Sequence, residues 1–274
     1  MYASSRVRAL ENGIVGKDRI ETMLKANNEA PQTIIQVNTL KITAEALKQR
    51  LAEENVEAGT HPWMPDCLIL GSTGDLEKLP AFRDGLFYVQ DPAAKLSVLC
   101  AELPDQEIRI LDCCAAPGGK SFAAAMATAG KGSITSCDIH EHKVPLIQKG
   151  AARLGVEKLT ARQQDASVNV EDWNDQFDAV IADVPCSGYG IIRKKPDIRY
   201  KAIADMAELP ELQLAILKNQ ARYVRPGGIL MYSTCTLVRA ENEGVVESFL
   251  QENKDYYLEP LPLPAVFPKN ESGM

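Results

Sequence analysis

The chain has 274 residues, of which 45% are apolar and 24% charged, and this length and composition allow one large globular domain or two modest ones. No apolar run is long enough to cross a bilayer, and residues 1–6 lack the apolar core of a signal peptide, so we expect a cytoplasmic protein without a membrane partner. The formal net charge of −7 argues against a surface that is basic throughout, as many nucleic-acid-binding proteins have.

The first 90 residues predict a small α+β subdomain. The spacing of Ile20, Met23 and Leu24 indicates that residues 1–30 are helical. Three β-rich segments follow, and Thr43 is placed to cap a helix after the first of them. The predicted strands are 33–40, 67–71 and 86–90. We therefore expect one domain over residues 1–90 and a second over residues 91–274.

From residue 108 onward, predicted strands alternate with predicted helices. This alternation is typical of parallel βαβ units with right-handed crossovers, as in Rossmann-like α/β domains. A turn over residues 225–228 leads into the fifth strand, and Pro145 and Gly155 fit the first turn and the end of one helix. The strands are 108–113, 133–138, 159–163, 177–183 and 229–234, and the helices are 120–128, 145–154 and roughly 212–224.

Beyond a further helix over residues 241–250 the chain is punctuated by prolines, and we predict no strand after Tyr257.

A glycine turn follows the first of these strands and opens a helix, in the sequence LDCCAAPGGK at residues 111–120. Glycines let the backbone approach a ligand closely, and this position in a parallel sheet suits a nucleotide-like cofactor. The spacing is neither GxGxxG nor a Walker A motif, which weakens a hydride or phosphoryl interpretation. Asp138 ends the second strand, and Asp165 follows the third. They could hold ribose and adenine, or cap a helix and a turn.

The fourth strand ends in ADVPCSGYG, which places Asp183 and Cys186 at the carboxyl end of a buried strand. The ligand crevice of an open parallel sheet lies at this end of the strands. Cys235 follows the fifth strand, and alone it would be interpreted as a buried strand residue. Chemistry and simple packing both remain open for these residues individually.

Seven cysteines and no signal peptide argue against a disulfide framework. No CxxC occurs and only three histidines are present, so we predict no metal site. We interpret four thiols as structural, namely Cys67, Cys100, Cys113 and Cys137.

A basic cluster lies directly after the fourth strand. It could be a solvated loop, and beside a candidate active site we favour a phosphate-facing patch. Its members are Arg193, Lys194, Lys195, Arg199 and Lys201.

Four motifs together, CCAAPGGK, ADVPCSGYG, RKKPDIRY and STCT, resemble the RNA cytosine-C5 methyltransferases of the Sun (Fmu) type, which use S-adenosylmethionine. The resemblance runs from about residue 27 to 250 and is strongest to the enzymes of bacterial small-subunit ribosomal RNA. It implies a Rossmann-like methyltransferase domain that acts on RNA and is preceded by a small α+β RNA-facing subdomain. We expect the protein to be a monomer.

The resemblance also implies roles for individual residues. Cys235 would be the nucleophile, Cys186 would assist release of the covalent product, and Asp183 would lie between cofactor and base. The implied cofactor-binding residues are Cys114, Ala115, Ala116, Pro117, Gly118, Gly119, Lys120, Asp138, Asp165 and Asp183.

The chemistry stands independently of the family. Cytosine C5 is a poor nucleophile, and a thiolate that adds to C6 pushes electron density onto it. The same reaction on tRNA, a non-catalytic cofactor- or RNA-binding remnant, and a Rossmann-type dehydrogenase are the alternatives. The missing GxGxxG argues against the last of these.

The sequence departs from the family pattern in three places. We expect neither the N-terminal all-helical RNA-binding domain nor the final strand pair, which would leave the fifth strand as an unprotected edge. Gln36 stands where the family commonly has Arg, so one phosphate contact would be missing.

Overall fold

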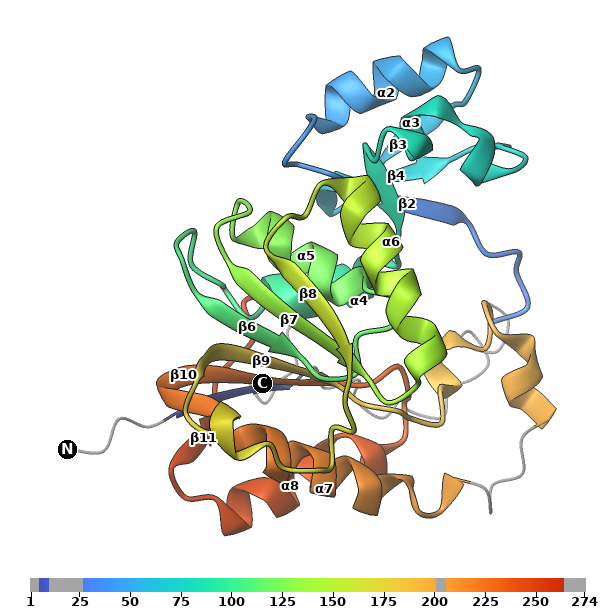
Figure 1. Cartoon of the computed structure of the whole chain (residues 1–274). Helices are drawn as coiled ribbons and strands as arrows, with labels where there is room; N and C mark the ends of the chain where they lie inside the picture. Colours follow the sequence, from blue (N-terminus) through green and yellow to red (C-terminus); the bar gives the residue numbers. More distant parts are fainter. Residues whose placement is uncertain (1–4, 10–26, 201–205, 264–274) are drawn as a thin grey trace. The chain divides into compact units, whose positions relative to one another are not determined.

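The computed structural model describes residues 5–9, 27–200 and 206–263, and these fall into two compact units (Figure 1). The first unit comprises residues 1–31 and 165–259, and the second comprises residues 32–164 and 260–274. The domain boundary near residue 90 stays a prediction. In the described ranges, no helix has the length and apolar character needed to cross a membrane.

The second unit contains a small antiparallel sheet with strand order β3-β4-β2-β5. Its elements follow one another as β-α-β-β-α-β, which with this strand order is the ferredoxin-like arrangement. Strand β3, which has the sequence AGTH and little apolar character, was not predicted. The elements are β2 (Thr33–Val37), α2 (Ala44–Glu53), β3 (Ala58–His61), β4 (Met64–Leu70), α3 (Pro80–Arg83) and β5 (Phe87–Val89).

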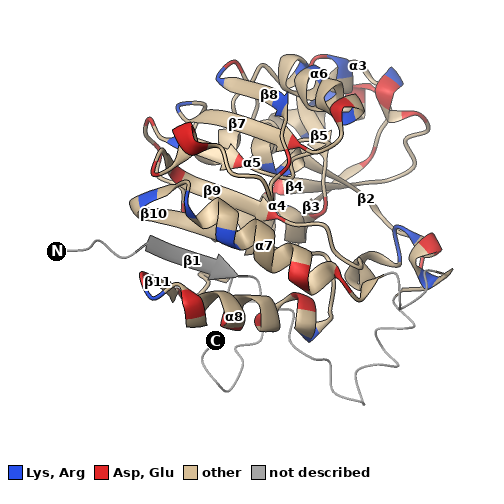
Figure 2. Ribbon diagram, turned by 60° about the horizontal axis from the view of Figure 1, so that its bottom comes forward, with Lys and Arg blue, Asp and Glu red and all other residues tan. Residues whose placement is uncertain are grey.

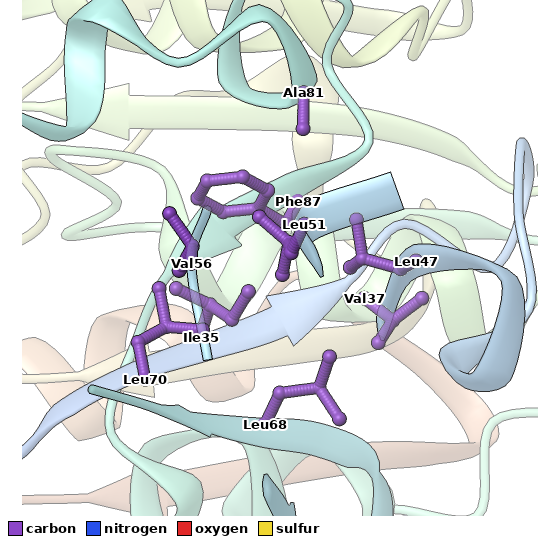
Figure 3. Close-up of a cluster of buried hydrophobic side chains, with 9 residues drawn as sticks. All are labelled: Ile35, Val37, Leu47, Leu51, Val56, Leu68, Leu70, Ala81 and Phe87. Atoms are coloured by element: carbon purple, nitrogen blue, oxygen red, sulfur yellow. The ribbon is translucent and has the colours of Figure 1, made fainter. Parts of the chain in front are cut away.

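An apolar cluster holds α2 and α3 against one face of this sheet (Figure 3). Thr43 caps α2 as predicted, because its Oγ1 accepts the backbone N–H of Ala46 at 3.3 Å. Leu47 and Leu51 then lie one turn apart on the buried face of the helix. A second cluster, containing Cys67 on β4 and residues of α4 (Pro92–Leu99), forms beside β4.

The same unit contains three parallel strands with the order β6-β7-β8. Helix α5 connects the first pair and α6 the second, as expected for βαβ crossovers. Pro145 lies in the first turn of α6, and Gly155 ends that helix at φ +72°, both as predicted. The elements are β6 (Arg109–Asp112), α5 (Gly119–Ala127), β7 (Ser133–Asp138), α6 (Val144–Leu154) and β8 (Leu159–Gln163).

Polar contacts, one of them fully buried, connect helix α6 to the ferredoxin-like elements. Nη1 of Arg153 donates to the carbonyls of Phe82 and Phe87 at 2.6 and 2.9 Å, and its guanidinium lies 3.7 Å over the Phe82 ring. Nδ2 of the fully buried Asn38 donates to the carbonyl of Leu154 at 2.7 Å. These contacts therefore connect the small sheet to the three-stranded sheet within this unit.

In its described residues, the first unit contains four parallel strands in the order β11-β1-β10-β9. Helix α7 packs against β9 and β10 and lies next to α8. The predicted turn at 225–228 is an irregularity inside β10, where the register shifts between Val224 and Ile229. The elements are β1 (Ser5–Ala9), β9 (Phe177–Asp183), α7 (Leu209–Ala221), β10 (Val224–Ser233), α8 (Glu243–Glu252) and β11 (Tyr256–Leu258).

Two expectations for the ends of the chain are wrong. Residues 5–9 form a strand instead of a helix, whereas residues 10–26 lie outside the described residues. Strand β1 pairs with β10 along Arg6–Ala9 and satisfies the backbone groups that we expected to be exposed at an edge. The unpredicted strand β11 pairs in turn with β1. These short strands exist because distant partners offer them hydrogen bonds.

Short 3-10 helices connect the main elements. They are η1 (Leu76–Lys78), η2 (Glu141–Lys143), η3 (Glu171–Trp173), η4 (Tyr189–Ile191), η5 (Pro196–Tyr200) and η7 (Arg239–Glu241).

Candidate active site

Two free thiols meet where the paired strands β9 and β10 end. Cys186 follows β9 and Cys235 follows β10, and their Sγ atoms are 3.2 Å apart. The backbone N–H of Cys235 also points at Sγ of Cys186, at 3.3 Å. Both side chains are half-buried, so each can be reached from solvent. The parallel register thus brings together two cysteines that are 49 residues apart.

The neighbouring thiol changes the acidity of Cys186. A hydrogen bond with Cys235 raises the pKa of Cys186 well above its ordinary value, and burial and the charge of an ionised Cys235 raise it further. Backbone N–H groups of Cys235 and Gly188 oppose this shift only in part. Cys186 therefore keeps its proton at neutral pH.

Asp183 is the last residue of β9 and pairs in register with Ser233 of β10. Its Oδ1 accepts the Ser233 hydroxyl at 2.8 Å, and the residue is half-buried. This contact fixes the rotation of the carboxyl group at the same strand end as the two thiols. A hydrogen-bonded carboxyl so close to the end of a strand is suited to contact a bound base.

In the second unit, the predicted glycine turn connects β6 to α5. Gly118 has φ +112° and a Cβ on it would lie 2.5 Å from Cζ of Phe122, so only glycine fits there. A Cβ on Gly119 would come within 2.9 Å of Nε2 of Gln90. The turn is anchored by the N–H of Ala115, which donates to the carbonyl of Cys137 at 2.7 Å. It presents bare backbone at the start of a helix.

A buried polar network behind this turn was not predicted. Oδ2 of Asp112 accepts the hydroxyl of Ser121 at 2.7 Å, and that hydroxyl accepts a bond from Ser136 at 2.7 Å. All three residues are fully buried. They fix β6, α5 and β7 relative to one another and so determine the shape of the turn. In the sequence, Asp112 could have been noticed because an acidic residue stands directly before CCAAPGGK.

Asp138 and Asp165 each stabilise their own turn. Oδ1 of Asp138 accepts the N–H of His140 at 3.0 Å, and the residue is only 7% exposed. Oδ1 of Asp165 accepts both the N–H and the hydroxyl of Ser167, at 2.8 and 2.7 Å. Asp165 caps its turn, as one interpretation had it, whereas Asp138 stabilises a turn and does not cap the helix that follows. Contacts with ribose and adenine stay predictions. Asp138 belongs to the second unit and Asp165 to the first.

The basic cluster is only partly available for phosphates. Arg193 donates to the carbonyl of Ala30 at 2.8 Å, and Arg199 donates to the carbonyl of Asn27 at 2.9 Å. Both guanidinium groups bind carbonyl oxygens within residues 27–30. These carbonyl oxygens compete with phosphates for the guanidinium N–H donors. Lys194 and Lys195 are exposed, and Lys201 lies outside the described residues. Acidic and basic residues are interspersed over both units (Figure 2).

Position 36, where we expected a phosphate contact to be missing, lies inside the small sheet. Gln36 is fully buried, and its Nε2 donates to the carbonyl of Gln90 at 3.1 Å and to Sγ of Cys67 at 3.3 Å. The four thiols that we interpreted as structural are buried as well. Burial raises the pKa of Cys137 to about 12, so this thiol is inert at neutral pH. Within the described ranges, no group of three or more potential metal ligands occurs.

Comparison with known proteins places this geometry in a family. The model of the 16S rRNA methyltransferase RsmB/F family matches residues 99–271, and that of an RsmF/B-like, ferredoxin-like domain matches residues 14–77. The chain belongs to this family. The first match contains both thiols and the glycine turn.

Individual relatives agree with this assignment. The chain is 38% identical over 243 residues to the probable ribosomal RNA small subunit methyltransferase B of Bacillus subtilis, covering 88% of this chain and 54% of that protein. It spans little more than half the length of the curated relatives that it matches first. The crystal structure of PH0851 superposes with a TM-score of 0.86 at 27% identity, covering 94% of this chain and 58% of that one.

A more distant structure has the same fold. NSun6 from Pyrococcus horikoshii, solved with SFG, superposes with a TM-score of 0.75 at 21% identity and covers 86% of this chain and 84% of its own. Together these likenesses confirm the predicted family and the predicted fold class, a Rossmann-like α/β methyltransferase fold with a small α+β subdomain before it.

Proposed function

We propose that this protein methylates C5 of a cytosine in small-subunit ribosomal RNA, using S-adenosylmethionine and a covalent bond between Cys235 and C6 of the base. The observation that carries the proposal is the 3.2 Å contact between Cys186 and Cys235 at the ends of paired strands. Two thiols in contact suit a cycle that first makes and then breaks a sulfur–carbon bond. Membership of the RsmB/F family supports the reaction class and the ribosomal RNA substrate.

The residues of the glycine turn fit the proposed cofactor. Gly118 and Gly119 leave backbone uncovered at the start of α5, where the helix dipole favours the carboxylate of a methionine moiety. Asp138, nearly buried at the end of β7, can accept hydrogen bonds from ribose hydroxyls. In the proposal Cys114–Lys120 complete this cradle, and a contact of Asp165 with adenine stays a separate prediction. When bound, S-adenosylmethionine supplies an electrophilic methyl group to C5.

The chain's own residues make the base reactive. The thiolate of Cys235 donates an electron pair to C6 to form the S–C6 bond, and the C5=C6 pair shifts toward C5. In the proposal a protonated Asp183, held by Ser233, donates a hydrogen bond to N3 and so offsets the negative charge that develops on the ring. Once C5 carries the methyl group, a water or hydroxide ion accepts its proton. As the C–H pair restores the C5=C6 bond, the S–C6 pair returns to Cys235, and the protonated Cys186 assists this release by donating a hydrogen bond to the departing sulfur.

The test is a methylation assay with labelled S-adenosylmethionine on small-subunit ribosomal RNA and, separately, on tRNA. We expect label in one cytosine of the ribosomal RNA and none in tRNA. Cys235→Ala should abolish labelling, and Cys186→Ala should accumulate a protein–RNA adduct that survives denaturing electrophoresis. Cys100→Ala removes a thiol that is 1% exposed and serves as the matched control that keeps activity.

Several outcomes would contradict the proposal. An unchanged Cys235→Ala protein would overturn the nucleophile assignment, and label in tRNA alone would overturn the substrate. Cofactor binding without turnover or adduct, for every RNA tested, would leave a non-catalytic binding protein instead.

A further inference from the structure

We propose that Glu241 and Asn242 are positioning residues that set the separation and alignment of the two thiols, an inference that rests on the proposed function. These adjacent residues lie at the start of α8, and each is only 3% exposed. Each holds one of the two thiol-bearing loops on both sides of its cysteine. Neither residue had a signal in the sequence, because acidic and amide groups at a helix start are usually simple caps.

Glu241 holds the loop of Cys186. Its Oε2 accepts the backbone N–H of Ser187 at 2.8 Å and the side-chain amide of Gln213 at 3.0 Å. The same Nε2 of Gln213 donates to the carbonyl of Pro185 at 2.9 Å. Both chain neighbours of Cys186 are therefore fastened to one carboxylate, one directly and the other through Gln213.

Asn242 holds the loop of Cys235 in the same manner. Its Oδ1 accepts the hydroxyl of Thr234 at 2.5 Å, and its Nδ2 donates to the carbonyl of Thr236 at 3.1 Å. Thr234 and Thr236 flank Cys235 on either side. One side chain thus fixes both neighbours of the second thiol.

The hydrogen bonds around the two thiol-bearing loops form one network. The hydroxyls of Ser187 and Thr236 lie 2.6 Å apart, which links the two loops directly. The hydroxyl of Tyr232 donates to the carbonyl of Glu241 at 2.6 Å and fixes the backbone of the pair. Because Glu241 and Asn242 are consecutive in the chain, neither thiol can shift without disturbing the residue that holds the other.

Energetics favour a role beyond simple loop closure. A buried carboxylate loses its hydration, and well-packed apolar groups commonly stabilise a loop equally well. A buried polar network does, however, specify one geometry, since every member must keep its partner. For a reaction in which one sulfur attacks a base and a second assists its departure, small displacements of either thiol lower the rate.

The experiment separates formation of the adduct from its release under single-turnover conditions. In Glu241→Met, adduct release should slow about tenfold or more while adduct formation changes little, because Cys186 loses its position. In Asn242→Ala, formation should slow by a similar factor, because Cys235 loses its position. Glu241→Gln should keep near-normal rates, since its amide oxygen can accept both hydrogen bonds.

Disulfide formation gives a readout that does not need activity. Diamide takes one hydrogen atom from each thiol and becomes a hydrazine as the Cys186–Cys235 bond forms, at a rate that depends on the approach of the two sulfurs. We expect this rate to fall several-fold in Glu241→Met and Asn242→Ala. Glu247→Ala is the matched control, because Glu247 lies on the same helix with its side chain 58% exposed.

The outcomes distinguish the two proposals. If Cys186→Ala and the wild type never form an adduct, the proposed function fails, and the diamide rates alone decide the positioning role. If the two variants lower formation and release equally, and diamide coupling keeps its wild-type rate in the folded fraction, Glu241 and Asn242 serve stability only and the inference is wrong.

Discussion

A thiol that contacts another thiol does not titrate as an isolated acid. Cys186 shares a hydrogen bond with Cys235, and this bond is the largest cause of its raised pKa. A proton is therefore retained on the side chain that is proposed to act during release. Ionisation of Cys235 makes the loss of that proton harder still, because two adjacent thiolates repel each other.

Removal of the partner should make Cys186 more acidic. In Cys235→Ala the pKa of Cys186 should fall toward the ordinary thiol value, because the hydrogen bond and the neighbouring charge are both removed. The measurement is the pH midpoint of Cys186 alkylation by iodoacetamide, followed by peptide mass spectrometry. Cys100→Ala should leave the midpoint unchanged, and an equal midpoint in Cys235→Ala would show that burial alone raises the pKa.

The glycine turn makes a second residue-level prediction. Gly118→Ala combines a φ of +112° with a Cβ that would lie 2.5 Å from Phe122, so it should cost about 2–4 kcal/mol of unfolding free energy and weaken cofactor binding. Gly74→Ala is the control, because Gly74 also has a positive φ and has nothing within 4 Å of the added carbon. Urea unfolding and cofactor titration check both variants. Equal costs would show that backbone strain, not the contact with Phe122, decides the effect.

At the scale of elements, local pattern predicts the structure wherever one segment supplies its own signal. Strands β7, β8 and β9 have the predicted bounds, because each follows a glycine or a polar residue and ends on a polar residue. Strands β1 and β11 are absent from the prediction, since their pairing partners are distant in the chain. The same reason explains which site residues could be predicted. The two thiols follow predicted strands and were found. Glu241 and Asn242 were not found, because their partners lie on other loops.

The loop that contains η4 and η5 is the element with a testable RNA contact. Replacement of Lys194 and Lys195 by Ala should weaken RNA binding at every sequence tested, because lysines contact phosphates without reading bases. For each phosphate that a lysine no longer neutralises, the slope of log affinity against log salt should become shallower by roughly 0.7–1. Lys78→Ala, with a side chain that is 76% exposed, is the control. An unchanged salt slope would exclude this loop from the interface.

At the scale of the whole molecule, charge and buried thiols determine how the protein responds to its solution. The net charge of −7 means that RNA must approach through local basic groups, against a repulsive background that salt screens. Thiols with a raised pKa make the protein sensitive to alkaline pH. Hydrogen bonds with a neighbouring thiol, followed by burial, raise the pKa of Cys113 and of Cys186, and burial raises the pKa of Cys137.

These raised pKa values predict a loss of stability in alkali. Above the ordinary thiol pKa of about 8.5 the unfolded chain loses protons that the folded chain keeps, so the unfolding free energy should fall as pH rises. Cys137, with a pKa of about 12 in the folded state, should contribute a loss of about 1–2 kcal/mol by pH 10. Urea unfolding at pH 7.5 and pH 10 measures the change. Cys137→Ala should show a smaller change than the wild type, and an equal one would refute this origin.

The position of β1 has a consequence for how the protein is made. Ser5–Ala9 leave the ribosome long before their pairing partners, which are residues 229–232 of β10 and residues 256–258 of β11. More than two hundred further residues must therefore be synthesised before this strand can dock. The sheet of the first unit is therefore completed late in translation. Until then the segment that forms β1 has no strand to pair with in the growing chain.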